Sequence, residues 1–212
     1  MKKITLRNQI LAFTALVAVI AVFVMDMNAV HAAGTSLAMA LTTGFTKICG
    51  PRSGGAVRVW LANVADVTSF TLNAGTGAYS AVTMVSGKVF YKFEFDQDSA
   101  FFKWSAALEN NSLKITKMVE FYLGYITQTH RNRLQDICDA SACGMIVIVE
   151  DSNGQLWVKG YTENFGAERP MKLKSIESDS GKAFTDANGS VVTLEVTDNE
   201  EPREFTGTVP VV

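Results

Sequence analysis

The stretch from Cys49 to Gly55, CGPRSGG, has the glycines, the arginine and the serine of a phosphate-binding loop. Such a loop binds an anion because a helix follows it and turns its free N–H groups toward the ligand. Here an apolar, β-prone run follows instead, over residues 56–64, and no Gly-Lys-Ser/Thr is present. The stretch therefore predicts a surface turn that enters a strand, and no nucleotide site is expected.

Histidine is the usual general base of a nucleophilic enzyme, and the chain has only two, His31 and His130. His130 stands beside Arg131 and Arg133, a pattern typical of a solvated helix face. No Gly-x-Ser-x-Gly nucleophile elbow accompanies it. We therefore predict no catalytic residue and a protein that is not an enzyme.

Metal ligands are equally scarce. Cys49, Cys138 and Cys143 are an odd number of cysteines, and the last two lack the two-residue spacing of a zinc knuckle. We expect three buried, reduced thiols, with a bridge between Cys138 and Cys143 as the alternative in an exported protein. No metal, cofactor or small-molecule substrate is predicted.

Acidic residues gather in two places. As outward-facing side chains they would solvate the surface, and in a channel they would let a polyanion slide past without sticking. The alternative is a paired-carboxylate site. The two groups are Glu94, Asp96 and Asp98, and Asp198, Glu200, Glu201 and Glu204.

Composition points to one soluble domain. The 212 residues are 48% hydrophobic and 19% charged, enough for one sizeable core. Without residues 1–33 the chain holds 16 Lys and Arg against 20 Asp and Glu, a net charge of −4. Mild acidity gives no general affinity for nucleic acid or anionic membrane, so a DNA-binding protein of the usual kind is excluded.

Residues 1–33 have the order of a secretory signal peptide. Lys2, Lys3 and Arg7 precede a 16-residue run, 10–25, that is apolar apart from one threonine, and small residues follow. A membrane-spanning helix needs about 20 apolar residues, which disfavours an uncleaved anchor. The other alternative is a translation start at Met39. We predict a single β-rich domain over residues 34–212.

Alternating apolar and polar residues predict that most of this domain is short strands. Residues 56–64, half-buried, and 112–124, long enough to project as a ribbon, are examples, and 145–151 is a continuous apolar run typical of a fully buried strand. The other predicted strands are 66–72, 79–85, 88–96, 155–161, 182–187, 190–196 and a last one within 201–212 that its prolines keep at a sheet edge.

Turn signals complete the predicted order. Asn153-Gly154 and Asn188-Gly189 predict two hairpins, with a long loop between them over residues 163–180. Leu134, Ile137 and Cys138 stand at helical spacing, which predicts one amphipathic helix near 128–140, with a threonine at its start and Gly144 at its end. The fold class expected is mainly β: a β-sandwich or partly open barrel of about eight to ten strands with one flanking α-helix.

This order of elements resembles one group of small virion proteins. CGPRSGGAVRVWLANVADVTSF, the Phe-rich VFYKFEF, ENNSLKITKMVEFYLG, a helix, MIVIVEDSNGQLWVKGY and a closing SVVTLEV with EPREFTGTV together resemble the tail tube and structural proteins of tailed bacteriophages, especially those of Bacteroidetes-type hosts. The resemblance covers residues 41–209. It implies subunits that form rings, usually hexamers, stacked into a hollow tube through which DNA passes without specific binding. It also implies assembly in the host cytoplasm into the virion.

A signal peptide does not fit that family, so a second interpretation stays open. It is an exported β-sandwich module at the cell surface or secreted: an adhesin, a pilus-like subunit or a carbohydrate-binding domain. Trp60, Trp104 and Trp157 would then be exposed for binding, whereas core packing is their more common use.

Overall fold

The computed structural model describes residues 44, 45, 47, 49 and 53–211. The chain separates into two units, Met1–Gly50 and Pro51–Val212. All of the described strands and helices belong to the unit Pro51–Val212. The leader, Met39 and residues 50–52 of the glycine-rich turn lie outside the described residues. None of the described helices is long and apolar enough to cross a membrane.

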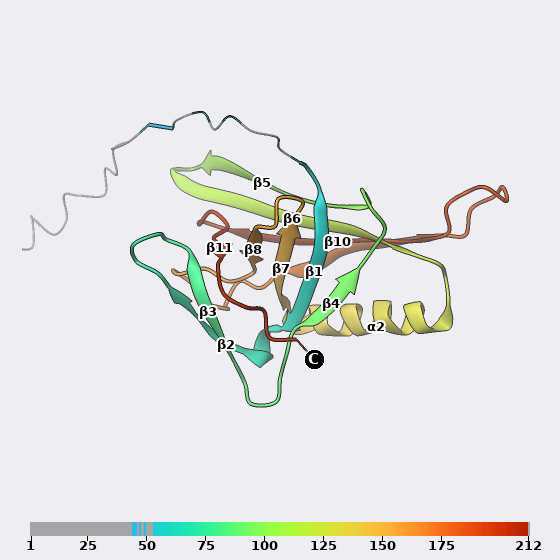
Figure 1. The fold of residues 1–212 in the computed structure, drawn as a ribbon, viewed down its shortest axis with the longest axis horizontal. Helices are drawn as coiled ribbons and strands as arrows, with labels where there is room; N and C mark the ends of the chain where they lie inside the picture. The colour runs from blue at the N-terminus through green and yellow to red at the C-terminus, as the bar shows by residue number, and fades with distance from the viewer. Residues whose placement is uncertain (1–43, 46, 48, 50–52, 212) are drawn as a thin grey trace, which may run out of the picture. The chain divides into compact units, whose positions relative to one another are not determined.

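Two β-sheets and one α-helix make up this unit (Figure 1), which confirms the predicted mainly β architecture with one flanking helix. The eleven described strands slightly exceed the number expected. The seven-stranded sheet has the order β2 (Val67–Leu72), β3 (Tyr79–Met84), β11 (Glu204–Phe205), β8 (Leu156–Lys159), β7 (Met145–Asp151), β1 (Ala56–Asn63) and β4 (Tyr91–Glu94). The four-stranded sheet has the order β5 (Ala100–Glu109), β6 (Ser112–Gly124), β10 (Gly189–Asp198) and β9 (Lys172–Asp179).

The four-stranded sheet is antiparallel throughout and contains the longest strands. β6 is the predicted long ribbon strand, and β5 is its partner in a hairpin. Asn110 and Asn111 close this hairpin with φ angles of 50° and 62°, the positive values that a tight two-residue turn requires. β5 was missed from the sequence because its adjacent phenylalanines and alanines do not alternate with polar residues.

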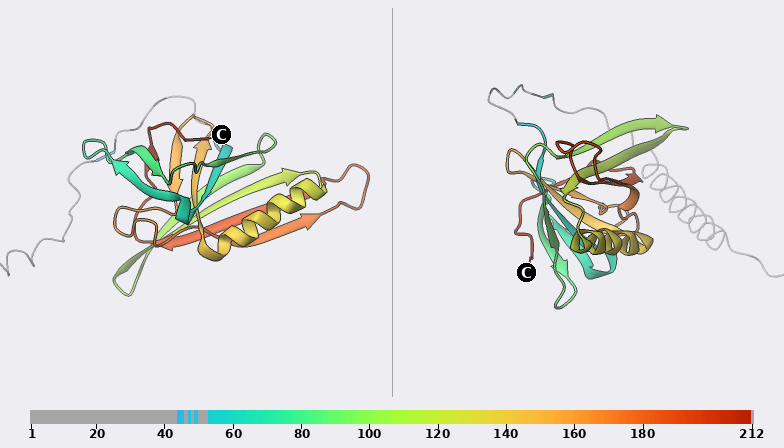
Figure 2. Two further views of the ribbon diagram at one scale, coloured as in Figure 1. Left: turned by 90° about the horizontal axis from the view of Figure 1, so that it is seen from below. Right: turned by 90° about the vertical axis from the view of Figure 1, so that its right-hand side faces the viewer.

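The helix α2 (Gln128–Cys143) begins at the predicted residue and has Gly144 at its C-terminal end as predicted. It continues beyond residue 140, where the sequence pattern placed its end. Thr127 is its N-cap and accepts a hydrogen bond from the backbone N–H of His130, and the N–H of Gly144 donates to Ala140 at the other end. Leu134 and Ile137 are buried. α2 runs beside β9 and β10, as Figure 2 shows, so it covers one end of the space between the sheets.

Two hydrophobic clusters lie on opposite faces of the seven-stranded sheet. The cluster between the sheets contains Val59 and Leu61 of β1, and the other contains Trp60 together with Tyr79 and Phe205. The half-buried strand expected over residues 56–64 is therefore wrong, because β1 is buried on both faces. The fully buried strand expected over 145–151 is confirmed. Since the second cluster joins strands from both halves of one sheet, that sheet curls around it.

Several predicted elements need correction. Residues 172–179 form strand β9 and not a loop, while residues 182–187 lie in the loop between β9 and β10. The turn at Asn153-Gly154 is confirmed between β7 and β8. β11 lies between β3 and β8 and not at an edge, which its two-residue length permits because the flanking prolines stay outside the strand.

Gly144 supplies a test of how closely the helix end packs. It has a φ of 100°, and a Cβ there would lie 2.2 Å from Cγ of Pro170. We expect Gly144→Ala to lower the free energy of unfolding by about 2–4 kcal/mol, from strain and overpacking combined.

The matched control is Gly154→Ala, at a φ of 81° with no atom within 4 Å of the added Cβ. It should cost only the backbone strain, about 1–2 kcal/mol. Urea unfolding of both variants measures the difference. Equal losses would show that Pro170 does not limit the space at Gly144.

Candidate functional site

The four-stranded sheet has two open edges. In the described part of the chain, β5 and β9 each have a strand neighbour on one side only. β5 has ten residues and β9 eight, so each edge offers backbone N–H and C=O groups to another strand. On β9 the row is shorter, because α2 lies beside it and Ser141 of α2 accepts a hydrogen bond from the N–H of Leu173. Such edges are the usual template for pairing with a further chain.

The hairpin of β5 and β6 exposes apolar side chains toward its turn. Leu108 is 71% exposed and Leu113, directly opposite it, is 48% exposed. Phe101, nearer the base of β5, is also exposed. Covering such side chains lowers the free energy of the system, so the hairpin is a candidate contact surface.

A second projection, the arm of residues 180–188, leaves the opposite end of the same sheet (Figures 1 and 2). Phe184 is fully exposed near its middle. The Asp186 carboxylate accepts hydrogen bonds from the backbone N–H groups of Ala183 and Lys182, at 2.7 and 2.8 Å, and these bonds lower its pKa. Asn188 fixes the base by accepting from Tyr125 and Ile126 ahead of α2. Hydrogen bonds therefore fix both the turn and the base of the arm, which leaves the side chain of Phe184 exposed to solvent.

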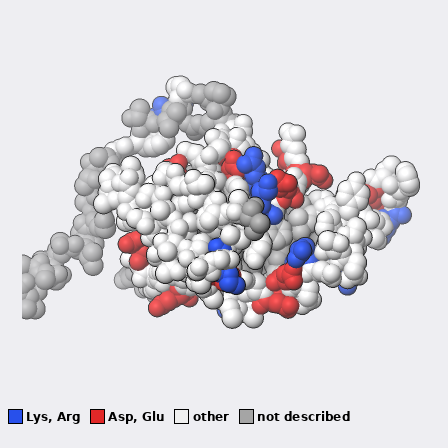
Figure 3. Space-filling view, turned by 60° about the horizontal axis from the view of Figure 1, so that its bottom comes forward, with Lys and Arg blue, Asp and Glu red and all other residues white. Residues whose placement is uncertain are grey.

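The outer face of this sheet is polar and of mixed charge. Ion pairs join Lys114 to Glu109 at 3.1 Å and Lys174 to Glu195 at 2.6 Å. Figure 3 draws another side of the molecule, on which acidic and basic side chains also lie next to one another. The acidic lining that the sequence indicated does not gather here.

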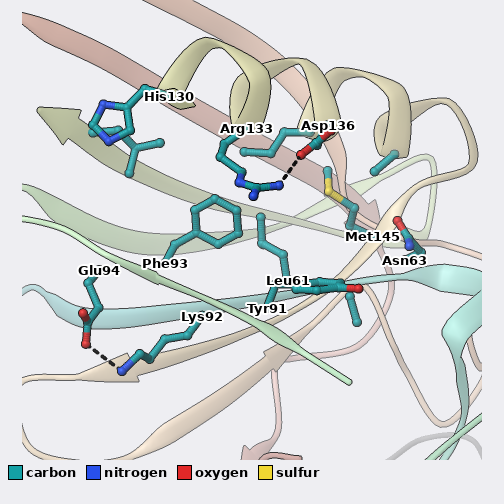
Figure 4. Close-up of a pocket in the computed structure, with 14 residues that line it drawn as sticks. Leu61, Asn63, Tyr91, Lys92, Phe93, Glu94, His130, Arg133, Asp136 and Met145 are labelled. Atoms are coloured by element: carbon teal, nitrogen blue, oxygen red, sulfur yellow. Dashed lines mark hydrogen bonds and ion pairs between the residues drawn. The ribbon is translucent and has the colours of Figure 1, made fainter. Parts of the chain in front are cut away.

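A groove of about 610 Å³ lies between α2 and strands β1 and β4 (Figure 4). Phe93, Ile137 and Met145 contribute apolar side chains to it. Ion pairs of 2.7 Å between Lys92 and Glu94, and 2.9 Å between Arg133 and Asp136, line it as well. The bond from Lys92 lowers the pKa of the Glu94 carboxyl. Because these acids and bases neutralise each other, the groove offers mainly an apolar surface.

His130 lines this groove and is half-buried, not fully solvated as predicted. Its Nδ1 contacts the backbone carbonyl of Tyr125, a residue with a φ of 64°. The imidazole thus stabilises the turn that leads into α2, and no serine or cysteine among the described residues is hydrogen-bonded to it.

Three ionisable side chains lie buried between the sheets. Lys117 of β6 and Asp198 of β10 form an ion pair, Nζ to Oδ2 2.8 Å, with both side chains 0% exposed. Lys159 of β8 is also fully buried, and its Nζ has no hydrogen-bond partner among the described residues. Asp198 was expected to solvate the surface, and that prediction is wrong. Lys117, which interrupts an apolar face in the sequence, fills an inward position.

Aromatic rings surround Lys159. Its Nζ lies 4.7 Å from the ring centroid of Phe102 and 5.0 Å from that of Trp104, distances at which ring faces attract a cation. Burial first of all, and then the charge of Lys117, nevertheless lower the pKa of Lys159 from its ordinary 10.5 to about 7, against the opposing pull of Asp198 and Glu201. Lys159 can therefore both give and take a proton near neutral pH. Nothing in the sequence distinguishes this lysine from the exposed ones.

The two acidic groups do not form one paired site. Asp96 lies beside Gly124 and Asp198 is paired with Ile115, and these positions are nine residues apart along β6, about 30 Å. Glu200 is hydrogen-bonded to Arg203, whereas Glu94, Asp96 and Asp98 are exposed.

Cysteines and tryptophans differ in part from expectation. Cys49, Cys138 and Cys143 are free and exposed, so both the burial and the bridge that we considered are wrong. Among the described residues, no cluster of three His, Cys, Asp or Glu side chains could hold a metal. Trp60 is core, as favoured, while Trp104 remains 39% exposed beside Lys159.

Searches against protein-family models, curated proteins and solved structures found no match for this chain.

Lys159 yields a prediction about pH. Because its pKa is lowered in the folded state, the unfolded chain takes up a proton between about pH 10.5 and 7 that the folded chain does not, and stability falls across that window as the pH is lowered. We expect Lys159→Met to raise the free energy of unfolding at pH 7 by about 3–5 kcal/mol. The variant should also lose much of the rise in stability between pH 7 and 9.5.

Lys103→Met on β5 is the control, since it makes the same substitution at an exposed lysine. Measurements stop below pH 10 because burial also raises the pKa of Tyr79, which adds a dependence of opposite sign at higher pH. An unchanged pH profile in Lys159→Met would contradict the pKa shift.

Proposed function

We propose that this chain is a structural subunit that assembles with copies of itself into rings, as a tail tube protein of a tailed bacteriophage does. The observation that carries the proposal is the four-stranded antiparallel sheet, whose terminal strands β5 and β9 each lack a second strand neighbour among the described residues, with α2 beside part of β9. The chemistry required of the chain is strand pairing alone.

The number of strands supports a closed ring. β5 and β9 run in opposite directions because three antiparallel pairings separate them. If β9 of one copy pairs with β5 of the next, the antiparallel alternation continues without interruption. Each copy then uses two different surfaces, a head-to-tail contact that closes into a ring when the rotation between copies is right.

Such a ring would have one face of the four-stranded sheet toward its centre. The inner face of the sheet packs on the seven-stranded sheet through residues such as Val119, Phe121 and Leu194. The outer face, with its paired lysines and glutamates, would line the lumen. Balanced charge gives little attraction for the phosphate backbone, which suits DNA that passes without specific binding.

The two projections supply contacts along a tube axis. The β5–β6 turn and the arm with Phe184 leave opposite ends of the sheet, so each could reach the next ring on its own side. Hexameric rings, stacking into a tube and assembly in the host cytoplasm into a virion are parts of this proposal that follow from the resemblance of the sequence.

The alternative is an exported module, and Trp104 is its specific support. A half-exposed tryptophan stacked on Phe102, with an interplanar angle of 7°, is a surface on which a sugar ring can lie. Sequencing the N-terminus of the native protein separates the two: Ala33 or Gly34 as the first residue supports export, and Met39 or Ala40 supports the ring subunit.

Lysines on the edge strand test the ring. We expect Phe101→Lys with Ser105→Lys to convert an assembly of several chains into single chains, because lysines on an edge strand oppose strand addition. Within the hairpin the new lysines lie opposite Glu120 and Thr116, so neither is directly opposite a like charge, although both flank Lys103 on the same face of β5. Light scattering and electron microscopy measure the assembly.

The control adds two lysines one strand further in, as Thr116→Lys with Tyr122→Lys on β6. These change the charge of the same face but leave both edges free, and the assembly should persist. A wild-type protein that stays a single chain at high concentration, or equal effects of both pairs, would contradict edge pairing.

The projections give a separate prediction. We expect Leu108→Ser with Phe184→Ser to leave rings intact but to shorten or abolish stacks, because the apolar contacts between rings are lost. Lys182→Ser, which alters the arm without removing its aromatic side chain, is the control. Electron micrographs of the two variants show the lengths, and tubes of unchanged length in the first would contradict this role.

A further inference from the structure

We propose that Lys117 and Asp198 condense into an isopeptide bond that covalently joins strands β6 and β10. The reacting atoms are Nζ of Lys117 and the side-chain carboxyl carbon of Asp198. This modification is independent of the proposed function, because it concerns the interior of one chain.

The position of the pair supplies the proximity that such a reaction needs. Nζ of Lys117 lies 2.8 Å from Oδ2 of Asp198. Lys117 pairs across the strands with Val196, and Asp198 with Ile115, so the two are diagonal neighbours on the same face of the sheet. Groups held in contact in this way react far faster than the same groups free in solution.

Burial keeps the reacting pair out of contact with solvent. Both side chains are 0% exposed, and their neighbours on the same face, Ile115, Val119 and Val196, are buried and apolar. Two charges are expensive in such a place. Transfer of one proton from the ammonium to the carboxylate leaves an amine and a carboxylic acid, and the amide that they form removes both charges for good.

The carboxyl group is held by its other oxygen as well. Oδ1 of Asp198 accepts a hydrogen bond of 3.2 Å from the backbone N–H of Glu200. When the amine attacks the carboxyl carbon, negative charge develops on an oxygen of that group. A fixed backbone donor at Oδ1 stabilises this charge and designates Oδ2 as the oxygen that leaves.

Lys159 is the candidate for the proton transfer. Its Nζ is buried and lies 5.0 Å from the ring centroid of Trp104, which is directly opposite Lys117 on the hairpin. Its Nζ is not hydrogen-bonded to either reacting group, so a shift of its long side chain has to bring it within reach of the attacking nitrogen. As a neutral amine it would then take a proton from that nitrogen and return it to the departing oxygen.

The atoms balance without any other reagent. A bond forms between Nζ of Lys117 and Cγ of Asp198, and the bond between Cγ and Oδ2 breaks. Oδ2 leaves as water with two protons that came from the Lys117 ammonium, and Lys159 ends in the state in which it began. No electron is transferred.

Mass spectrometry of the full chain, purified and then denatured, tests the proposal. We expect a mass lower by one water molecule than the sequence of that N-terminus requires, and a branched tryptic peptide that joins the segment of Lys117 to that of Asp198. A wild-type chain that is folded, has the full mass and yields separate linear peptides after long incubation overturns the proposal.

Two variants assign the roles. Lys117→Arg should abolish both the mass loss and the branched peptide, because a guanidinium is not a nucleophile at neutral pH. Lys159→Met keeps the reacting pair, so bond formation after refolding should be slower by about 100-fold or more. A Lys159→Met chain that forms the bond at the wild-type rate would overturn the role of Lys159, and circular dichroism confirms that each variant is folded.

Discussion

Burial of the seven-stranded sheet on both faces is the constraint on which the rest of this structure depends. β1 and β7 carry apolar side chains toward both sides, so each side needs a cover. The four-stranded sheet and α2 cover one side. The outer strands of the seven-stranded sheet itself curl over and cover the other side. A strand that is apolar on both faces is stabilised only inside such a layered arrangement, because both of its faces are then removed from water.

The covering sheet has a double role because its two faces differ. Its inner face packs on the core and carries Lys117 and Asp198, while Lys159 belongs to β8 of the opposite sheet. Its outer face is polar, and its edges β5 and β9 have no strand neighbour in the described residues. The core holds the sheet rigid, and rigid edges are what pairing between copies requires. The stability of one chain and the proposed assembly of many thus use the same four strands.

Charges inside an apolar core usually reduce stability, so the buried group calls for a physical reason. Lys117 and Asp198 compensate each other, whereas Lys159 relies on aromatic rings and on a lowered pKa. Condensation of the first pair would remove the ionic cost and tie the long strands β6 and β10 together. A covalent tie would serve a tube subunit under mechanical load and an exported module equally well.

Sequence alone determined the features that depend on neighbouring residues. One of two threonines, Thr127 or Thr129, and Gly144 mark the ends of α2, Asn153-Gly154 marks a hairpin, and the continuous apolar run of β7 marks a strand buried on both faces. Tertiary structure decided whatever depends on distant residues. β9 has many charged residues and forms a strand because β10 pairs with it. Lys117, Asp198 and Lys159 are ordinary polar residues in the sequence, and they become a buried group only because three strands from two sheets meet there, since burial and pKa are properties of surroundings that a local pattern does not contain.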